Sequence, residues 1–282
     1  MPIFTAGTRA LRGVKGQRLV LNTQVGPVRA LAYGLDRPDV LPLFLNMHGG
    51  GFTLGSAEMD DPFMPRVAAG AGVKILSLDY SLAPEKPFPA ALNECFAAVT
   101  YAKEHARELG IDPDRIAVGG HSAGGNLSAG ICLLDADKKS LGIKALVLDY
   151  PPLDLHTDPF LKPCPKKAIP PRMARLFDAA YAGSREAARN PLISPRFASA
   201  EQLRTFPPTL MISAGQDSLM PEEADFKDRL IKAGVPVTYR LFEGVAHGFT
   251  LKRGREADEA WQLMTDYLKR QLASAPPAES SG

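Results

Sequence analysis

Cysteine is scarce in this sequence, and its spacing excludes two common structural devices. Only Cys95, Cys132 and Cys164 occur among the 282 residues. The count is odd, and no C-x-x-C pair or Cys/His cluster appears, which excludes a disulfide framework and a structural zinc site and favours a reducing compartment. Cys95 and Cys132 lie in apolar helical patterns, so we expect both to be buried as small hydrophobic residues.

The sequence also has no large excess of charge of either sign and no long apolar run. The net charge is +2, from 33 basic and 31 acidic residues, and the basic residues are scattered, so neither a nucleic-acid stripe nor a polybasic membrane patch is expected. No run is apolar enough to span a membrane, and Met1 to Gly16 contain no apolar core of a secretory signal. We expect a soluble cytoplasmic protein that binds no nucleic acid, membrane or metal and needs no cofactor.

Short apolar runs alternate with helical patterns along most of the chain. Leu41–Met47 and Arg115–Val118 are nearly continuous apolar runs, as in strands that are buried on both faces. This alternation predicts an α/β fold with a mostly parallel sheet of about eight strands and helices on both faces. Ligands of such sheets bind outside the carboxyl ends of the strands. The other predicted strands are Gln17–Asn22, Val28–Gly34, Val73–Leu78, Ala145–Leu148, Thr209–Ser213 and Val237–Phe242, and the predicted helices are Pro89–Leu109, Ala123–Leu134, Pro221–Ala233 and Glu256–Leu272.

A proline-rich stretch interrupts the alternation after the sixth predicted strand. Residues 151–199 contain one predicted helix, Pro171–Tyr181. A segment this long inside a compact domain is usually a lid, a binding loop or an inserted subdomain, and we interpret it as a cap over the site. We therefore predict one domain over residues 1–273, followed by a disordered, Pro-rich tail at 274–282.

The sequence Gly120-His121-Ser122-Ala123-Gly124 matches the pattern G-x-S-x-G. A bare match is weak, because a Gly/Ser-rich helix start without function looks the same. Here the match follows a predicted strand and precedes a predicted helix, which is the context that exposes a serine hydroxyl on a sharp turn. Ser122 is therefore the candidate nucleophile.

A second constellation, His48-Gly49-Gly50-Gly51-Phe52, follows the strand Leu41–Met47. Glycines there let backbone N–H groups approach a ligand closely, as an enzyme of acyl transfer needs around its oxyanion. A flexible turn and a phosphate-binding loop are the alternatives. The phosphate-binding loop is disfavoured, because neither G-x-x-x-x-G-K-[ST] nor G-x-G-x-x-G is present.

A base and an acid can be chosen from the residues that follow later strands. His247, one of five histidines, comes shortly after the last strand, and Asp217 comes shortly after Thr209–Ser213. The order serine, acid, histidine is the order expected around a G-x-S-x-G turn. Asp149 also ends a strand after the nucleophile, but it leads into prolines that suit a structural turn. Glu222 and Glu223 are weaker rivals at a helix start.

These motifs together resemble the hormone-sensitive-lipase-like family of α/β-hydrolase esterases, over roughly residues 40–270. The segment from Asp79 to Glu85 is similar to the family's D-Y-R-L-A-P-E, with serine at position 81. Asn126 and His247-Gly248-Phe249 also match, whereas His121 stands where the family often has Asp or Thr. The resemblance implies the α/β-hydrolase fold, an oxyanion hole formed by the N–H groups of Gly50, Gly51 and Ala123, and a bracing role for His48.

The predicted function is that of a serine carboxylesterase acting on short acyl esters, from acetyl to hexanoyl, through Ser122, His247 and Asp217 and an acyl-enzyme. The chain length before His48 and the single modest cap motivate the short acyl group. A deacetylase of acetylated carbohydrates and a non-catalytic small-molecule binder are the alternatives. The predicted partner is a small-molecule ester, with a homodimer as an option. The expected substrate contacts are Phe52, His156, Leu219 and Phe249.

Overall fold

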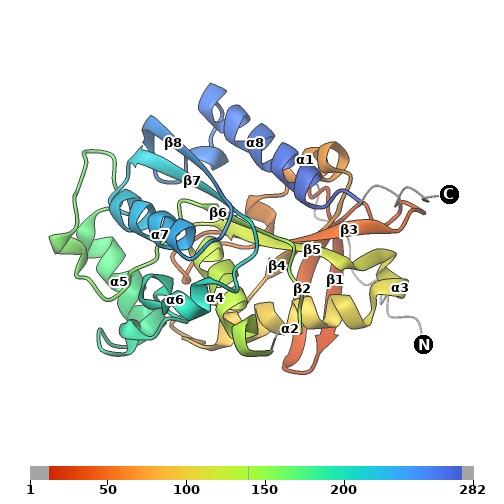
Figure 1. The fold of residues 1–282 in the computed structure, drawn as a ribbon, viewed down its shortest axis with the longest axis horizontal. Coiled ribbons are helices and arrows are strands. Elements are labelled where there is room, and N and C mark those ends of the chain that lie inside the picture. The colour runs from red at the N-terminus through yellow and green to blue at the C-terminus, as the bar shows by residue number, and fades with distance from the viewer. Residues whose placement is uncertain (1–12, 139, 275–282) are drawn as a thin grey trace.

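The computed structural model describes residues 13–138 and 140–274, which are built around one eight-stranded sheet (Figure 1). The strand order is β1-β2-β4-β3-β5-β6-β7-β8. The pairs β1–β2 and β2–β4 are antiparallel, and every other pair is parallel. The strands are β1 (Gln17–Thr23), β2 (Gly26–Tyr33), β3 (Leu41–Met47), β4 (Lys74–Asp79), β5 (Ile111–His121), β6 (Ala145–Asp149), β7 (Thr209–Gln216) and β8 (Val237–Ala246).

Helices cover both faces of this sheet and bury its apolar side chains. The longer ones are α1 (Met64–Ala71), α2 (Ala90–Glu104), α4 (Ala123–Lys138), α5 (Pro171–Ala182), α7 (Met220–Lys232) and α8 (Arg255–Gln271). Helices α1 and α8 pack on one face, and α2, α4 and α7 pack on the other (Figure 1). Within the described residues, no helix has the length and hydropathy that a membrane crossing requires.

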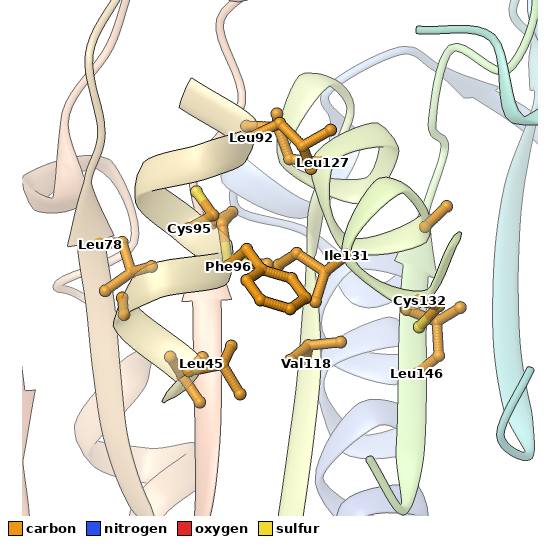
Figure 2. Close-up of a cluster of buried hydrophobic side chains, with 14 of the residues drawn as sticks. Leu45, Leu78, Leu92, Cys95, Phe96, Val118, Leu127, Ile131, Cys132 and Leu146 are labelled. Atoms are coloured by element: carbon orange, nitrogen blue, oxygen red, sulfur yellow. The ribbon is translucent and has the colours of Figure 1, made fainter. Parts of the chain in front are cut away.

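The larger core lies between α2, α4 and the central strands. Figure 2 shows Phe96 of α2 and Ile131 of α4 meeting Leu45 and Val118 of the sheet. Each such side chain contributes about 1.5–3 kcal/mol when it is fully buried. Cys95 and Cys132 are buried and free, as their apolar helical patterns predicted, whereas Cys164 is exposed and free.

The predicted α/β fold is confirmed, although one predicted helix is in fact two. The pattern Pro89–Leu109 predicted a single helix, but α2 ends at Glu104 and a short helix α3 (Ala106–Leu109) follows. His105 separates them with φ −105° and ψ 25°, while its ring stacks on Tyr101 at 3.9 Å. This side-chain contact and the local backbone are invisible in an apolar repeat, which continues across the break.

Helix α1 was missed by the sequence patterns, because glycine disfavours a helix interior by about 1 kcal/mol. Its sequence ends Ala-Ala-Gly-Ala, which does not suggest a helix. In the structure, a Cβ on Gly70 would lie 2.7 Å from the methyl carbon of Thr265 on α8. Glycine therefore allows α1 and α8 to approach closely, and the packing outweighs the low intrinsic preference.

The chain between β6 and β7 contains the stretch predicted as a cap, residues 151–199, which is called the cap below, and its continuation to β7. It contains α5 and the short helices η2 (Pro159–Leu161), η3 (Ala187–Arg189), η4 (Pro195–Phe197) and α6 (Ala200–Leu203). Asn126 of α4 ties both ends of the cap to the body, since its Nδ2 donates to the carbonyl oxygens of Pro152 and Ile193 at 2.8 Å each. Of the predicted tail at 274–282, residues 275–282 lie outside the described residues.

A buried ion pair also anchors the cap to α7. Glu222, in the first turn of α7, accepts hydrogen bonds from the N–H groups of Leu153 and Asp154 at 2.7 and 3.0 Å. Lys162 of the cap donates to the same carboxylate at 2.6 Å, and the two side chains are only 9% and 4% exposed. Removing only one partner of such a buried pair strongly destabilises a protein, because the other partner is left as a buried charge.

This anchor predicts a loss of stability for Glu222→Gln. The amide oxygen still accepts from the two N–H groups, but Lys162 loses the carboxylate that it contacts and keeps only Asp154 and Asp178 as nearby acidic groups, so unfolding should become easier by about 1–3 kcal/mol. Urea unfolding followed by circular dichroism measures this difference. Adding Lys162→Met removes the buried cation and should recover part of the loss; a double variant no more stable than Glu222→Gln would contradict the ion-pair explanation.

Candidate active site

Ser122 lies on a sharp turn between β5 and α4, with φ at 51°. The small residues around it are required by the end of β3, because a Cβ on Gly120 or on Gly124 would overlap the carbonyl oxygen of Met47. The N–H of Ser122 is held at 2.8 Å by the carbonyl oxygen of Asp149. The turn thus fixes the serine in a backbone conformation that non-glycine residues rarely adopt.

A chain of hydrogen bonds joins Ser122 to His247 and Asp217. The Oγ of Ser122 lies 2.8 Å from Nε2 of His247, and Nδ1 of His247 lies 2.6 Å from Oδ2 of Asp217. An ionised carboxylate only accepts, so Nδ1 carries the proton and Nε2 presents its lone pair to the serine hydroxyl. The structure therefore brings together the three residues that the sequence predicted as nucleophile, base and acid.

The other carboxylates that could have been the acid face elsewhere. Asp149 lies 2.6 Å from Nδ1 of His121, and Glu222 faces the cap as described above. Glu223 is fully buried, and burial together with the negative charge of Asp217 raises its pKa well above the usual range. Of these carboxylates, Asp217 is the one within hydrogen-bond distance of His247.

The glycine loop after β3 lies against the serine turn. An added Cβ on Gly49 would be 3.5 Å from the Cβ of Ser122, and Gly50 and Gly51 have φ values of 125° and 58°. Positive φ values of this kind are accessible to glycine but rarely to other residues, so glycine allows the backbone N–H groups of this loop to adopt these orientations. The predicted donors of Gly50, Gly51 and Ala123 thus belong to two segments that meet at Ser122.

His48 braces this loop from beneath, as the resemblance implied. Its ring stacks on Tyr80 at 4.2 Å, and the hydroxyl of Tyr80 donates to the carbonyl oxygen of His48 at 2.7 Å. Burial lowers the pKa of His48, which keeps the ring neutral. The neighbouring Ser81 is bonded through its N–H and hydroxyl to Glu94, at 2.7 and 2.6 Å. This contact occupies the position where the similar family carries arginine.

The predicted substrate contacts fall in different places. Phe52 is 2% exposed and stacks on Tyr181 of the cap at 3.8 Å, while Phe249 is 5% exposed and packs against Tyr150 and Phe242. Both rings support the walls of the site from within the core.

The two remaining candidates are Leu219 and His156, and they lie in different parts of the structure. Leu219 is nearly buried in the loop after Asp217, and its N–H donates to that carboxylate at 3.2 Å. His156 lines a cavity of about 280 Å³ within the cap, next to Arg175 and Arg185. The residues lining that cavity do not include Ser122.

Phe177 of α5 is a site neighbour that the sequence analysis did not single out. A Cβ on Gly51 would lie 2.5 Å from its ring, so the ring covers one side of the glycine loop. The helical pattern of Pro171–Tyr181 predicted the helix but not its distance from the loop, because the two segments are far apart in the chain.

His121, directly before the nucleophile, is buried between two carboxylates. Its Nδ1 lies 2.6 Å from Asp149 and its Nε2 lies 3.4 Å from Asp60. Burial alone would lower the pKa of His121, but the charge of Asp60 and the hydrogen bond and charge of Asp149 outweigh it and raise the pKa to about 9. The imidazole is therefore protonated at neutral pH.

The raised pKa of His121 predicts a pH-dependent stability. The unfolded histidine titrates near ~6.5, so the stabilising charge is fully present below that pH and is lost as the pH rises through about 9. The free energy of unfolding of the wild type should therefore decline over this window relative to that of His121→Gln. Urea titrations of both proteins at several pH values provide the measurement, and parallel pH curves would count against a buried imidazolium.

Comparisons with known proteins agree with this geometry. A family model described as alpha/beta hydrolase fold matches residues 44–251. The carboxylic ester hydrolase LipN of Mycobacterium tuberculosis is 36% identical over 239 residues, which cover 79% of this chain and 61% of LipN. The chain therefore spans a little under two thirds of that relative's length. Bovine hormone-sensitive lipase is 46% identical over 95 residues, 32% of this chain and 13% of the lipase.

Solved structures show the same similarity over nearly the whole chain. The carboxylesterase EstE1, cloned from a metagenomic library, superposes with a TM-score of 0.84 at 30% identity, covering 92% of this chain and 90% of EstE1. The esterase of the archaeon Pyrobaculum calidifontis superposes with a TM-score of 0.82 at 31% identity, covering 91% and 86%. With its glycine loop, its serine turn and its family match, the chain belongs to the α/β-hydrolase-fold family, in the hormone-sensitive-lipase-like group that its motifs predicted.

Proposed function

We propose that this protein is a serine carboxylesterase in which Ser122 is the nucleophile, His247 the general base and acid, and Asp217 the carboxylate that orients His247. The unbroken chain of hydrogen bonds at 2.8 and 2.6 Å carries the proposal. Names of similar proteins, such as carboxylesterase and arylesterase, favour the same chemistry. The hydrogen-bonded arrangement of Ser122, His247 and Asp217 also disfavours the alternative of a non-catalytic small-molecule binder.

The first half of the reaction acylates Ser122. As its Oγ bonds to the ester carbonyl carbon, the hydroxyl proton passes to Nε2 of His247, and the carbonyl oxygen becomes an oxyanion. The N–H groups of Gly50, Gly51 and Ala123 are the proposed donors to that oxyanion. The C–O bond to the alcohol then breaks, and the proton on Nε2 goes to the departing alkoxide.

The second half repeats these steps with water. His247 accepts a proton from water as its oxygen bonds to the acyl carbon, and the acid leaves as the proton returns to Ser122. Asp217 is 1% exposed, so its charge faces the imidazolium without screening by bulk water. It holds the tautomer that both halves require.

Replacing the proposed nucleophile and acid should lower kcat far more than replacing Asp149, the other candidate for the acid. Ser122→Ala should lower kcat by roughly 10⁴-fold or more, and Asp217→Asn by roughly 10³–10⁴-fold, because the amide favours the wrong tautomer of His247. Asp149→Asn leaves the His247–Asp217 bond in place, so its loss should stay below roughly 10²-fold. Steady-state kinetics with p-nitrophenyl acetate measure all three.

Labelling with a fluorophosphonate provides the control for this comparison. The wild type should be labelled and Ser122→Ala should not, with matching circular dichroism spectra. Equal labelling of both proteins would exclude Ser122 as the nucleophile, and a larger loss for Asp149→Asn than for Asp217→Asn would move the acid to Asp149.

The acyl group is proposed to be short, from acetyl to hexanoyl. Phe177 covers one side of the glycine loop, and α5 is held there by the stack of Tyr181 on Phe52 and by the hydrogen bond from the N–H of Phe88 to the carbonyl oxygen of Tyr181 at 3.0 Å. The ring of Phe177, held beside the glycine loop, limits the space for the acyl chain of a substrate.

Removing this ring should shift the chain-length preference. For Phe177→Ala, kcat/KM for p-nitrophenyl octanoate should rise by roughly 10-fold relative to the acetate, because a pocket gains about that factor for a few added methylenes. Phe160→Ala, which removes an exposed ring elsewhere on the cap, is the matched control and should keep the wild-type ratio. An unchanged ratio in Phe177→Ala would show that another wall limits the acyl chain.

A further inference from the structure

A second set of hydrogen bonds lies behind the proposed triad and converges on Asp149. Its Oδ2 accepts from Nδ1 of His121 at 2.6 Å and from the hydroxyl of Thr250 at 2.7 Å. The hydroxyl of Tyr150 is bonded to the same Thr250 oxygen. These residues come from the end of β5, the end of β6 and the short helix η5 (Phe249–Leu251) that follows His247.

The donors and acceptors in this set can be assigned. The hydroxyl of Thr250 donates to Oδ2 of Asp149, and this hydroxyl has a single proton. The bond between Tyr150 and Thr250 must then run from the tyrosine hydroxyl to the threonine oxygen. Every proton in the set therefore points toward Asp149, and the imidazolium of His121 supplies a counter-charge in a site where all four side chains are buried.

These residues contact the segments that carry two members of the proposed triad, Ser122 and His247. The backbone carbonyl of Asp149 holds the N–H of Ser122 at 2.8 Å. Thr250 is three residues beyond His247, and its carbonyl oxygen accepts from the indole N–H of Trp261 at 2.8 Å. The ring of Tyr150 meets the imidazole of His247 edge to face, with centroids 4.8 Å apart. One carboxylate is thus bonded to the segments that carry both the serine and the histidine.

We propose that Thr250 is a positioning residue for His247, and that its hydroxyl, bonded to Asp149, sets the distance between the imidazole and Ser122. The inference rests on the proposed function, in which His247 is the base. Thr250 does not reach the substrate; it acts by fixing the loop of His247 and the ring of Tyr150 against the imidazole. A misplacement of about 1 Å at a reacting group costs up to roughly 10²-fold in rate.

Thr250→Val tests the hydroxyl, because valine keeps the shape and the branched Cβ of threonine. We expect kcat for p-nitrophenyl acetate to fall by roughly 10-fold or more with KM within about twofold, since substrate contacts remain while the proton transfer loses its geometry. Thr250→Ser keeps the hydroxyl and should restore most of the rate. Urea unfolding of each variant shows that the assayed protein is folded.

Asp149→Ala removes the acceptor and tests the same bond from its other end. Once that bond is gone, Thr250→Val has no bond to Asp149 left to break, so the double variant Asp149→Ala with Thr250→Val should lose no more than the worse single variant. If Asp149→Ala folds poorly, the comparison of Thr250→Val with Thr250→Ser provides the test.

Three results would overturn the inference: wild-type kcat in folded Thr250→Val, a Thr250→Ser variant as slow as Thr250→Val, or independent, multiplicative losses in the double variant. His247→Ala, assayed alongside, separates this failure from failure of the proposed function. If His247→Ala retains activity, the proposed base is wrong; if it is inactive while Thr250→Val is normal, only the positioning role is wrong.

Discussion

The contact between the end of β3 and the serine turn is the constraint on which the site depends. The carbonyl oxygen of Met47 lies so close to Gly120 and Gly124 that neither position has room for a Cβ. The glycine loop begins at the next residue, His48, so the same close approach brings this loop beside the turn on which Ser122 has a positive φ. The close approach of these two segments therefore positions both the proposed nucleophile and the proposed oxyanion donors. The segments meet because β3 and β5 are adjacent parallel strands whose carboxyl ends lie at the same edge of the sheet.

The buried carboxylates around the site have different surroundings, and these surroundings separate their roles. Asp217 is paired with His247, Asp149 and Asp60 with His121, and Glu222 with Lys162. Burial and the charge of Asp217 raise the pKa of Glu223 well above its usual range. An uncompensated charge in such an interior is costly, and each ionised carboxylate here faces a cation or a group that becomes one. The arrangement keeps a single negative charge bonded to His247.

The fold, and the proximity of the three proposed triad residues, could be predicted from the sequence because both depend on local patterns. Ser122, Asp217 and His247 each follow an apolar strand by a few residues, and parallel strands bring their carboxyl ends to one edge of the sheet. Contacts between distant segments could not be predicted in this way. The position of Phe177 over Gly51, the bond of Thr250 to Asp149 and the close approach of α1 to α8 at Gly70 depend on tertiary distances. His121 was visible as a departure from the family pattern, but its carboxylate neighbours at positions 60 and 149 were not.

The hydrogen bond between Ser122 and His247 joins residues 125 positions apart in the chain. During synthesis, β5 and the serine turn emerge long before β8 and the loop that carries His247. The parallel pairing that aligns them also requires β6 and β7 first, since those strands lie between β5 and β8 in the sheet. Such non-local pairing forms late in folding. A nascent chain therefore carries Ser122 without its proposed base until β8 and the loop of His247 have been synthesised, and the proposed hydrolytic activity should arise only after that point.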